Sequence, residues 1–237
     1  PECDQFNGIH EGLVQSWKDI FPKKGEIHFA GALENNEDTG TLQYLASTAM
    51  EAGFSTRVLD MQALDLQNGR FFDPAGELVN RCFKLYPWEW MVDESPDGCL
   101  AEMEWLEPIW KLVMSNKAIL ATLYELFPDS PYVLPCYLSR PRSGLFCKKP
   151  VFSREGHNVS VVDIRDWEEY VRIAETEGDY NTGAYVYQEY AEPTAYSGRY
   201  PVIGSWIIGG EAAGIGIREN RMEVTDNLSE FVPHIIG

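Results

Sequence analysis

Apolar residues at the start of the chain recur with helical spacing. Phe6, Ile9, Leu13 and Trp17 fall on one face of a helix that we expect to end near Phe21. The spacing therefore predicts an N-terminal helix with a single buried face.

Two short apolar runs flank a second predicted helix. Residues 27–30 and residues 56–59 each predict a strand. A polar segment between them leads into a helix through Ala52, and Thr39 or Thr41 could provide its N-terminal cap. Strand, helix and strand at this spacing predict a βαβ unit with parallel strands.

Turn-forming residues mark the segment that follows. Asn68-Gly69 and residues 73–76 favour tight turns, so we expect a hairpin-like insert over residues 66–86. The acidic stretch of residues 89–105 is interrupted at Pro96 and indicates a boundary.

We accordingly expect two parts. Residues 1–98 would hold the βαβ unit and the insert, on the substrate side, and residues 99–237 would hold a nucleotide-binding region. Within the second part, Ser115 begins a predicted helix that Pro128 stops. Beyond it the pattern is mostly extended, and Gly209-Gly210 predicts a hairpin turn. The predicted strands cover residues 145–147, 159–163, 184–190, 202–208 and 212–218.

The charge balance narrows the range of partners. The 237 residues include 19 Lys and Arg against 37 Asp and Glu, for a formal net charge of −18. This disfavours a nucleic-acid or anionic-membrane partner, because both need a basic face. It does not disfavour ATP, which a few local cations can hold, and it suits a cationic substrate.

Cysteine usage and the chain's opening add two expectations. The five cysteines contain no CxxC pair, which disfavours a disulfide framework or a zinc site and favours a cytoplasmic setting. No stretch has the pattern of a signal peptide or a membrane span. Because the sequence opens on Pro1 without a methionine, we expect a fragment or a processed product.

Three cations are candidates for binding phosphate. Lys149 ends an apolar run before a loop containing Gly156, Lys117 lies in the first turn of a predicted helix, and Arg218 ends a glycine-containing strand. Phosphate oxygens require charge-assisted donors from several elements. Each residue could instead be an ordinary surface cation, and Lys148 and Lys149 would face opposite sides of a strand.

Other motifs give weaker indications of function. Gln188-Glu189 interrupts an apolar strand. A polar pair at such a position is compatible with an adenine-binding site, but it is equally compatible with an ordinary edge strand. The glycines of residues 209–216 lack the following helix that a dinucleotide fingerprint requires. The aromatic segment 84–90 favours core packing at a domain seam. The four histidines show no metal-ligand spacing and no catalytic triad is legible.

Six segments of the chain form a recognisable set when they are taken together in order. They are residues 83–90, 106–111, 115–120, 148–156, 203–206 and 213–219. This set resembles the glutathionylspermidine synthase family, which comprises ATP-grasp amide ligases related to trypanothione synthetase. The resemblance runs through the whole chain and implies an α/β (α+β) ATP-grasp fold, with a small βαβ pre-ATP-grasp-like unit on the N-terminal side.

The resemblance also implies a reaction and its site. ATP would convert a carboxylate to an acyl phosphate, and an amine would then displace phosphate to form an amide. The acid would be glutathione-like and the amine polyamine-like, with ATP and Mg²⁺ as cofactors. By motif, the ATP-binding residues would be Lys117, Lys149, the loop residues Ser153, Arg154, Glu155 and Gly156, and the adenine-linker residues Gln188, Glu189, Tyr190 and Ala191.

Arg218 would stabilise the transferring phosphoryl group, as the catalytic residue. Less securely, Glu37, Leu85 and Glu89 would border the acid and amine pockets. The family's Mg²⁺-binding Arg-x-Asp and Glu-x-Asn elements precede the region matched here, so no metal ligand is assigned to this chain. We expect the 237-residue segment to be inactive or to need its upstream part.

Two alternatives remain open. The chain could be a non-catalytic ATP-binding or interaction module, or a ligase for a different acid and amine.

Overall fold

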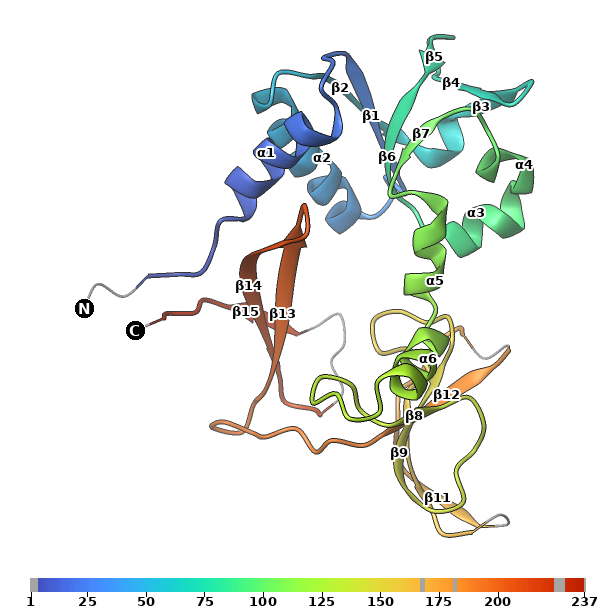
Figure 1. Cartoon of the computed structure of the whole chain (residues 1–237), viewed down its shortest axis with the longest axis vertical. Coiled ribbons are helices and arrows are strands. Elements are labelled where there is room, and N and C mark those ends of the chain that lie inside the picture. Colours follow the sequence, from blue (N-terminus) through green and yellow to red (C-terminus); the bar gives the residue numbers. More distant parts are fainter. Residues whose placement is uncertain (1–3, 167–168, 181–182, 224–228, 237) are drawn as a thin grey trace. The chain divides into compact units, whose positions relative to one another are not determined.

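The computed structural model of the chain describes residues 4–166, 169–180, 183–223 and 229–236. They form two compact units, drawn in Figure 1. None of the helices in these described ranges has the length and apolarity needed to cross a membrane. Unit 1 comprises Pro1–Leu112, Ser205–Ile215 and Ile236–Gly237, and unit 2 comprises Val113–Gly204 and Gly216–Ile235.

A four-stranded parallel sheet forms the centre of unit 1. β1 (Glu26–Gly31) lies between β2 (Ser55–Asp60) and β6 (Arg81–Leu85), and β7 (Glu104–Leu106) adds an edge strand beside β6. The helix α2 (Asn36–Glu51) connects β1 to β2. The predicted βαβ unit with parallel strands is therefore confirmed.

Helices α1 (Ile9–Ile20) and α2 cover one face of this sheet (Figure 1). Trp17 of α1 packs edge-on against Phe29 of β1, with ring centroids 5.5 Å apart. The indole N–H of Trp17 donates a hydrogen bond of 2.8 Å to the hydroxyl of Thr48, which is fully buried on α2. This pairing allows two polar groups to enter the core without losing their hydrogen bonds.

The N-terminal cap of α2 differs from the prediction. Asn35, in an extended conformation, accepts hydrogen bonds from the backbone N–H groups of Glu37 at 2.8 Å and Asp38. Thr39 lies inside the helix, and its hydroxyl donates to the carbonyl of Leu33 at 3.1 Å. The predicted caps Thr39 and Thr41 were wrong because the helix begins before them, where Asn35 already satisfies the free N–H groups.

A small antiparallel sheet packs on the other face of unit 1. It consists of β3 (Asp65–Gln67), β4 (Arg70–Phe72) and β5 (Leu78–Val79), which confirms a hairpin insert. The insert is shorter than the predicted residues 66–86, because residues 81–85 continue as β6 of the parallel sheet. Phe71 and Val79 are buried against that sheet.

Short helices complete unit 1. Trp88, Met91 and Cys99 join Phe71 and Val79 in the second buried cluster, which confirms core packing for the aromatic segment. The elements are η1 (Met61–Ala63), α3 (Trp88–Glu94), α4 (Pro96–Cys99), η2 (Ile109–Lys111) and, at the division between the units, α5 (Leu112–Ser115).

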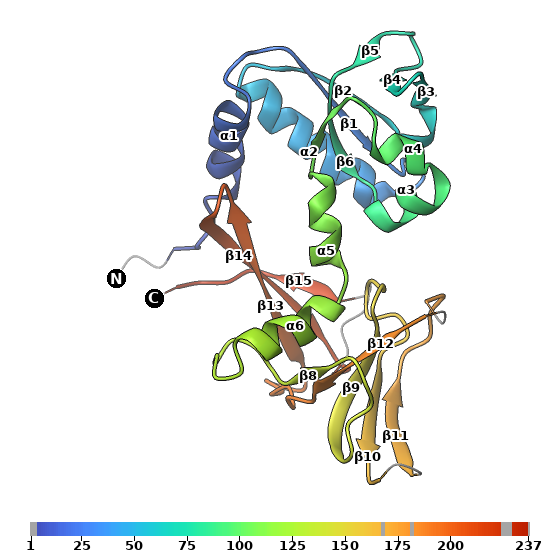
Figure 2. The ribbon, with the colours of Figure 1, turned by 45° about the vertical axis from the view of Figure 1, so that its right-hand side comes forward.

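An antiparallel sheet of five strands forms the body of unit 2 (Figure 2). The helix α6 (Ala118–Leu126) packs on it through Ala121, which lies in a buried cluster with Cys136 and Val186. The strand order is β11 (Tyr170–Glu175), β10 (Ser160–Ile164), β9 (Gly144–Pro150), β12 (Tyr185–Glu189) and β8 (Cys136–Tyr137).

The remaining sheet contains β13 (Tyr200–Ile208), β14 (Glu211–Asn220) and β15 (Glu230–Val232). Gly209 and Gly210 connect β13 to β14 with φ angles of +61° and +89°. Glycine adopts such left-handed conformations without a steric cost. The predicted hairpin turn at these two residues is confirmed.

Candidate functional site

Lys149 and Gln188 meet on one face of the unit 2 sheet. Antiparallel pairing places Gln188 of β12 opposite Cys147 of β9, two residues before Lys149. Residues two apart on a strand share a face, and Lys149 Nζ donates to Gln188 Oε1 at 2.7 Å. The fold thus brings together two candidate residues from distant parts of the sequence.

The neighbouring Lys148 points to the opposite face. Its ammonium lies 4.1 Å from the ring centroid of Tyr185, in a cation–π contact. The two lysines therefore lie on opposite faces of the sheet. The sequence alone did not show which of them faces Gln188. Only Lys149 shares a face with the polar group of Gln188.

Two thiols share the face of Lys149. Cys136 and Cys147 both lie opposite Gln188 in the ladder, one on each neighbouring strand. Burial raises the pKa of both thiols, and the charge of Lys149 only partly opposes it. These cysteines are therefore protonated near neutral pH and are poor nucleophiles.

Lys117 lies immediately before α6 and contacts the chain that follows β9. Its backbone N–H donates to the carbonyl of Val151 at 2.8 Å. Its ammonium donates to the carbonyl of Ser153 and, at 2.9 Å, to the hydroxyl of the same residue. The structure therefore joins Lys117 to the first residue of the candidate loop.

The loop from Ser153 to Gly156 forms a tight turn between β9 and β10. Glu155 and Gly156 have φ angles of +54° and +74°, and the N–H of His157 donates to the carbonyl of Arg154 at 2.8 Å. The hydroxyl of Thr176 donates to the carbonyl of Gly156. Arg154 and Glu155 are exposed at the tip, so the loop is anchored at its ends and open to solvent between them.

The chain leaving β12 runs beside two other segments. The N–H of Glu189 donates to the carbonyl of Pro135 at 2.8 Å, and that of Tyr190 donates to the carbonyl of Leu145 at 3.0 Å. Ala191, the last of the candidate linker residues, follows and is exposed. These bonds fix the backbone of the linker between β8 and β9.

Glu223 is a neighbour of this linker that the sequence reasoning missed. The Tyr190 hydroxyl donates to Glu223 Oε2, and this hydrogen bond, with burial, raises the pKa of Tyr190. Glu223 follows the segment 213–219 by four residues. Its position close to that motif was the one sequence feature that could have drawn attention to Glu223. Nothing in the sequence spacing predicts its contact with Tyr190.

Arg218 lies on β14, in a different sheet from that of Lys149. It pairs with Phe231 in the β14–β15 ladder, and its guanidinium carbon lies 6.0 Å from the centroid of that ring. Its side chain is exposed.

The carboxyl ends of β1 and β6 form a second candidate region, in unit 1. The chain leaves β1 towards β2 on one side and later returns to β6 on the other. In parallel sheets such a switch point is the usual place of a ligand crevice. Glu37 lies in the first turn of α2, Leu85 ends β6, and Glu89 lies in the first turn of α3. The fold thus gathers the three candidate substrate residues at one edge.

Lys84 is buried beneath this edge and contacts the segment that follows β6. Its side chain is 6% exposed, its Nζ donates to the carbonyl of Tyr86 at 2.7 Å, and it lies 3.7 Å from the ring centroid of Trp88. The Tyr86 hydroxyl donates to Glu94 at 2.6 Å, and burial, with this bond, raises the pKa of Tyr86 to about 12. The segment after β6 is therefore held by buried polar contacts.

Comparison with known proteins gives consistent family matches. A family model described as "Glutathionylspermidine synthase preATP-grasp" matches residues 1–237. A Haemophilus influenzae protein named "Putative acid--amine ligase" is 35% identical over 243 residues, covering 98% of this chain and 62% of the relative.

More distant relatives carry related names. Trypanothione synthetase from Crithidia fasciculata is 28% identical over 236 residues, covering 87% of this chain and 35% of the relative. The bifunctional glutathionylspermidine synthetase/amidase of Escherichia coli is 26% identical over 266 residues, covering 97% of this chain and 42% of the relative. The chain thus spans at most 62% of the length of these three relatives.

The fold is also found among solved structures. The "Putative gamma-glutamylcysteine synthetase" from Methylobacillus flagellatus KT matches with a TM-score of 0.61 at 9% identity, covering 97% of this chain and 75% of that chain. A likeness at this identity concerns the fold alone.

Proposed function

Since the chain belongs to the glutathionylspermidine synthase family, we propose that it acts in an ATP-dependent ligase that joins a carboxylate to an amine. The observation that carries the proposal is the contact of Lys149 with Gln188, on one face of the unit 2 sheet. It unites a cation suited to phosphate with the strand proposed to hold adenine. The names of the relatives, all ligases or synthetases, support the reaction class.

The nucleotide would be held in an ATP-grasp arrangement within residues 99–237. An ammonium group has three donors, so Lys149 can keep its bond to Gln188 and still donate to phosphate oxygens. Lys117 would do the same beside the loop Ser153–Gly156. That loop would close over the phosphates, and residues 188–191 would hold the adenine ring.

The proposed reaction has two steps. A carboxylate oxygen attacks the terminal phosphorus of ATP, the bond from that phosphorus to the bridging oxygen breaks, and ADP leaves. The amine nitrogen then attacks the acyl carbon, the bond from carbon to the phosphate oxygen breaks, and the nitrogen loses a proton to give the amide. Arg218 would stabilise the charge on the transferring phosphoryl group.

The two organic substrates would lie at the carboxyl edge of the unit 1 sheet. Glu37 and Glu89 carry negative charges suited to an amine, and the backbone around Leu85 closes the edge. We propose a glutathione-like acid and a polyamine-like amine, following the names of the relatives. The buried contacts of Lys84 would hold this edge rigid during binding.

ATP-dependent ligases commonly use Mg²⁺ to bridge the phosphates. The part of the chain that the structure describes contains no group of three or more His, Cys, Asp or Glu side chains suited to an ion. We therefore assign no metal-binding role to any residue of the described ranges.

An ADP-release assay tests the proposal. The purified full-length protein is incubated with ATP, Mg²⁺, glutathione and spermidine, and each substrate is omitted in turn. We expect continued ADP formation, beyond one ADP per protein molecule, only when both acid and amine are present, with an equal amount of amide. Arg218→Ala should slow this ADP release. ATP binding without ADP release would contradict a ligase and favour a non-catalytic nucleotide-binding module.

A further inference from the structure

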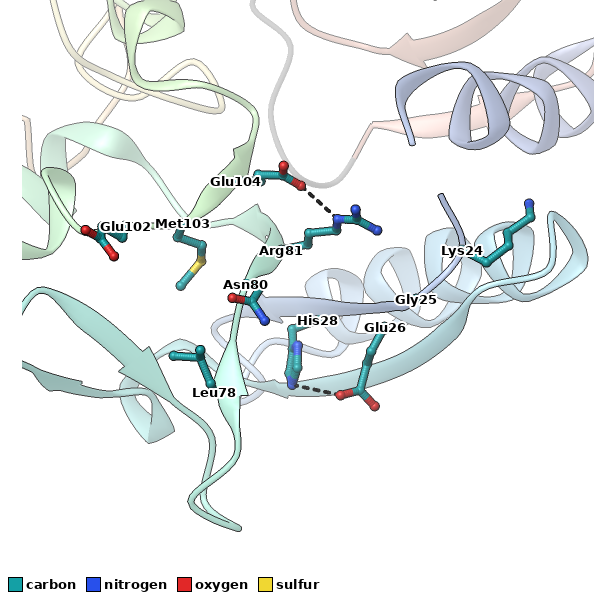
Figure 3. A pocket seen from close by; sticks show the side chains of 10 residues that line it. All are labelled: Lys24, Gly25, Glu26, His28, Leu78, Asn80, Arg81, Glu102, Met103 and Glu104. Atoms are coloured by element: carbon teal, nitrogen blue, oxygen red, sulfur yellow. Dashed lines mark hydrogen bonds and ion pairs between the residues drawn. The ribbon is translucent and has the colours of Figure 1, made fainter. Parts of the chain in front are cut away.

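Two features of the described residues have no role in the proposed reaction. One is a cavity of about 670 Å³ at the amino ends of the unit 1 strands (Figure 3). Its glutamates are already compensated by arginines and indicate no ligand: Glu26 pairs with Arg57, Glu102 with Arg70 and Glu104 with Arg81. The other is the supporting segment, residues 176–180 of unit 2, which contacts the chain at the end of the candidate phosphate loop.

The backbone of that loop has an unusual conformation. Glu155, Gly156 and Asn158 have φ angles of +54°, +74° and +55°. Glycine adopts such left-handed conformations easily and asparagine tolerates them, but they are uncommon for a glutamate. Uncommon backbone conformations persist where surrounding contacts fix them. The loop therefore depends on contacts from outside its own sequence.

Thr176, the first residue after β11, provides such contacts. Its hydroxyl donates to the carbonyl of Gly156 and accepts from the N–H of Val159 at 3.0 Å. Its backbone N–H donates to the carbonyl of Val159 at 2.9 Å. One side chain thus joins the end of the loop to the residue that leads into β10.

The rest of the supporting segment packs against the residues that follow the loop. The N–H of Tyr180 donates to Asn158 Oδ1 at 2.7 Å, and the N–H of Asn158 donates to the carbonyl of Glu177 at 3.4 Å. A Cβ added at Gly178 would lie 2.5 Å from the Cβ of His157, so only glycine allows this close approach. Residues 156–158 are therefore held from one side by backbone and side-chain contacts.

The start of the loop is held by a different residue. Lys117 donates to the carbonyl of Ser153 and, at 2.9 Å, to its hydroxyl. Arg154 and Glu155 form the exposed tip between Lys117 and Thr176. A loop whose two ends are already ordered loses less conformational freedom when a ligand binds, which increases affinity.

We propose that Thr176 is a positioning residue for the phosphate groups of ATP. Its hydroxyl orders the loop through Gly156 and Val159 before the nucleotide binds. This inference rests on the proposed ATP-dependent function. Because adenine would be held at residues 188–191, the contribution of Thr176 should appear only with ligands that carry phosphate.

The test compares variants of the full-length protein. Thr176→Val replaces the hydroxyl by a methyl group of similar size, Thr176→Ser keeps the hydroxyl, and Thr122→Val makes the first change at an exposed position of α6. Calorimetry measures the affinity for ATP, and an NMR titration measures the affinity for adenosine, which lacks phosphate. We expect Thr176→Val to weaken ATP binding about tenfold and to leave adenosine affinity within about twofold. ATP affinity should stay within about twofold in the other two variants.

Three results would overturn the inference while leaving ATP binding itself established: unchanged ATP affinity in Thr176→Val, an equal loss of adenosine affinity, or equal weakening by Thr176→Ser. Failure of the unchanged full-length protein to bind ATP would overturn the proposed function, and this inference with it.

A measurement without nucleotide tests the support of the loop directly. The N–H of His157 donates to the carbonyl of Arg154 at 2.8 Å across the loop. If Thr176 orders the loop, this amide should exchange its hydrogen faster in Thr176→Val than in Thr122→Val. Equal exchange rates in the two variants would contradict the role of Thr176, whether or not the protein is a ligase.

Discussion

Two adjacent lysines should differ in their effect on ATP binding: replacing Lys149 should weaken it, and replacing Lys148 should leave it nearly unchanged. Lys149→Met removes the ammonium that donates to Gln188 at 2.7 Å on the proposed nucleotide face. Lys148→Met makes the same chemical change one residue earlier, where the ammonium lies 4.1 Å from the Tyr185 ring on the opposite face. The pair therefore holds side-chain chemistry, net charge and strand constant, and varies only the face.

The magnitude follows from the contact that would be lost. A hydrogen bond to a charged group contributes about 1.5–3 kcal/mol. At 1.4 kcal/mol for each factor of ten, Lys149→Met should weaken ATP binding by about 10- to 150-fold. Lys148→Met forfeits a cation–π contact of about 0.5–1 kcal/mol, which lowers the stability of unit 2 rather than its affinity for ATP.

Isothermal titration with ATP measures both variants, and urea unfolding shows whether each remains folded. The long-range loss of one positive charge is the same in both, so its effect cancels in the comparison. Equal weakening by the two substitutions, or ATP affinity in Lys149→Met within about twofold of that of the unchanged protein, would refute the proposed role of this face.

Three further predictions concern unit 1. Asn35→Ala should lower the free energy of unfolding by about 1 kcal/mol because two backbone N–H groups lose their acceptor. The exposed Thr41→Ala should change it by less than about 0.5 kcal/mol, and equal effects in urea unfolding would refute the observed cap. Gly31→Ala should cost about 1–3 kcal/mol, because the added Cβ would lie 3.0 Å from the carbonyl oxygen of Leu85, and an unchanged melting temperature would contradict this packing. Hydrogen bonds from backbone N–H groups and from an arginine hold the pKa of Asp73 below its usual 3.8, so its stabilising effect is present above pH 3.8 and lost as the pH falls through the lowered pKa. Asp73→Asn should flatten this acid limb, and an unchanged pH profile of unfolding would contradict it.

Much of the secondary structure could be predicted because the local signals agree with the fold. Apolar runs at residues 27–30 and 56–59 and the amphipathic spacing of Leu13 and Trp17 match β1, β2 and α1. Gly209-Gly210 fixes a hairpin by its backbone freedom alone. In each case one short segment carries the whole signal.

Elements that depend on distant partners were not predicted. β7, β8 and β15 contain two or three residues each, too few for a recognisable alternation, and they are strands only because a neighbouring strand pairs with them. β11 is exposed along its whole length, so burial imposes no pattern on its sequence.

In the candidate site, too, the local features could be predicted from the sequence and the contacts between distant segments could not. The residue types at Lys117, Lys149 and Gln188 were visible in the sequence, and their local context together with the family resemblance suggested roles in binding phosphate and adenine. Which lysine of the pair faces Gln188, and that Glu223 accepts from Tyr190, follow from strand register and from a contact between distant segments. No local pattern encodes either.

The most direct test of the ligase proposal is the fate of carboxylate oxygen. Glutathione labelled with ¹⁸O in its glycine carboxylate is incubated with the purified full-length protein, ATP, Mg²⁺ and spermidine, and the inorganic phosphate is analysed by mass spectrometry. An acyl phosphate intermediate transfers one carboxylate oxygen to phosphate, so we expect one ¹⁸O atom in each phosphate released. Amide formation with unlabelled phosphate would contradict the mechanism.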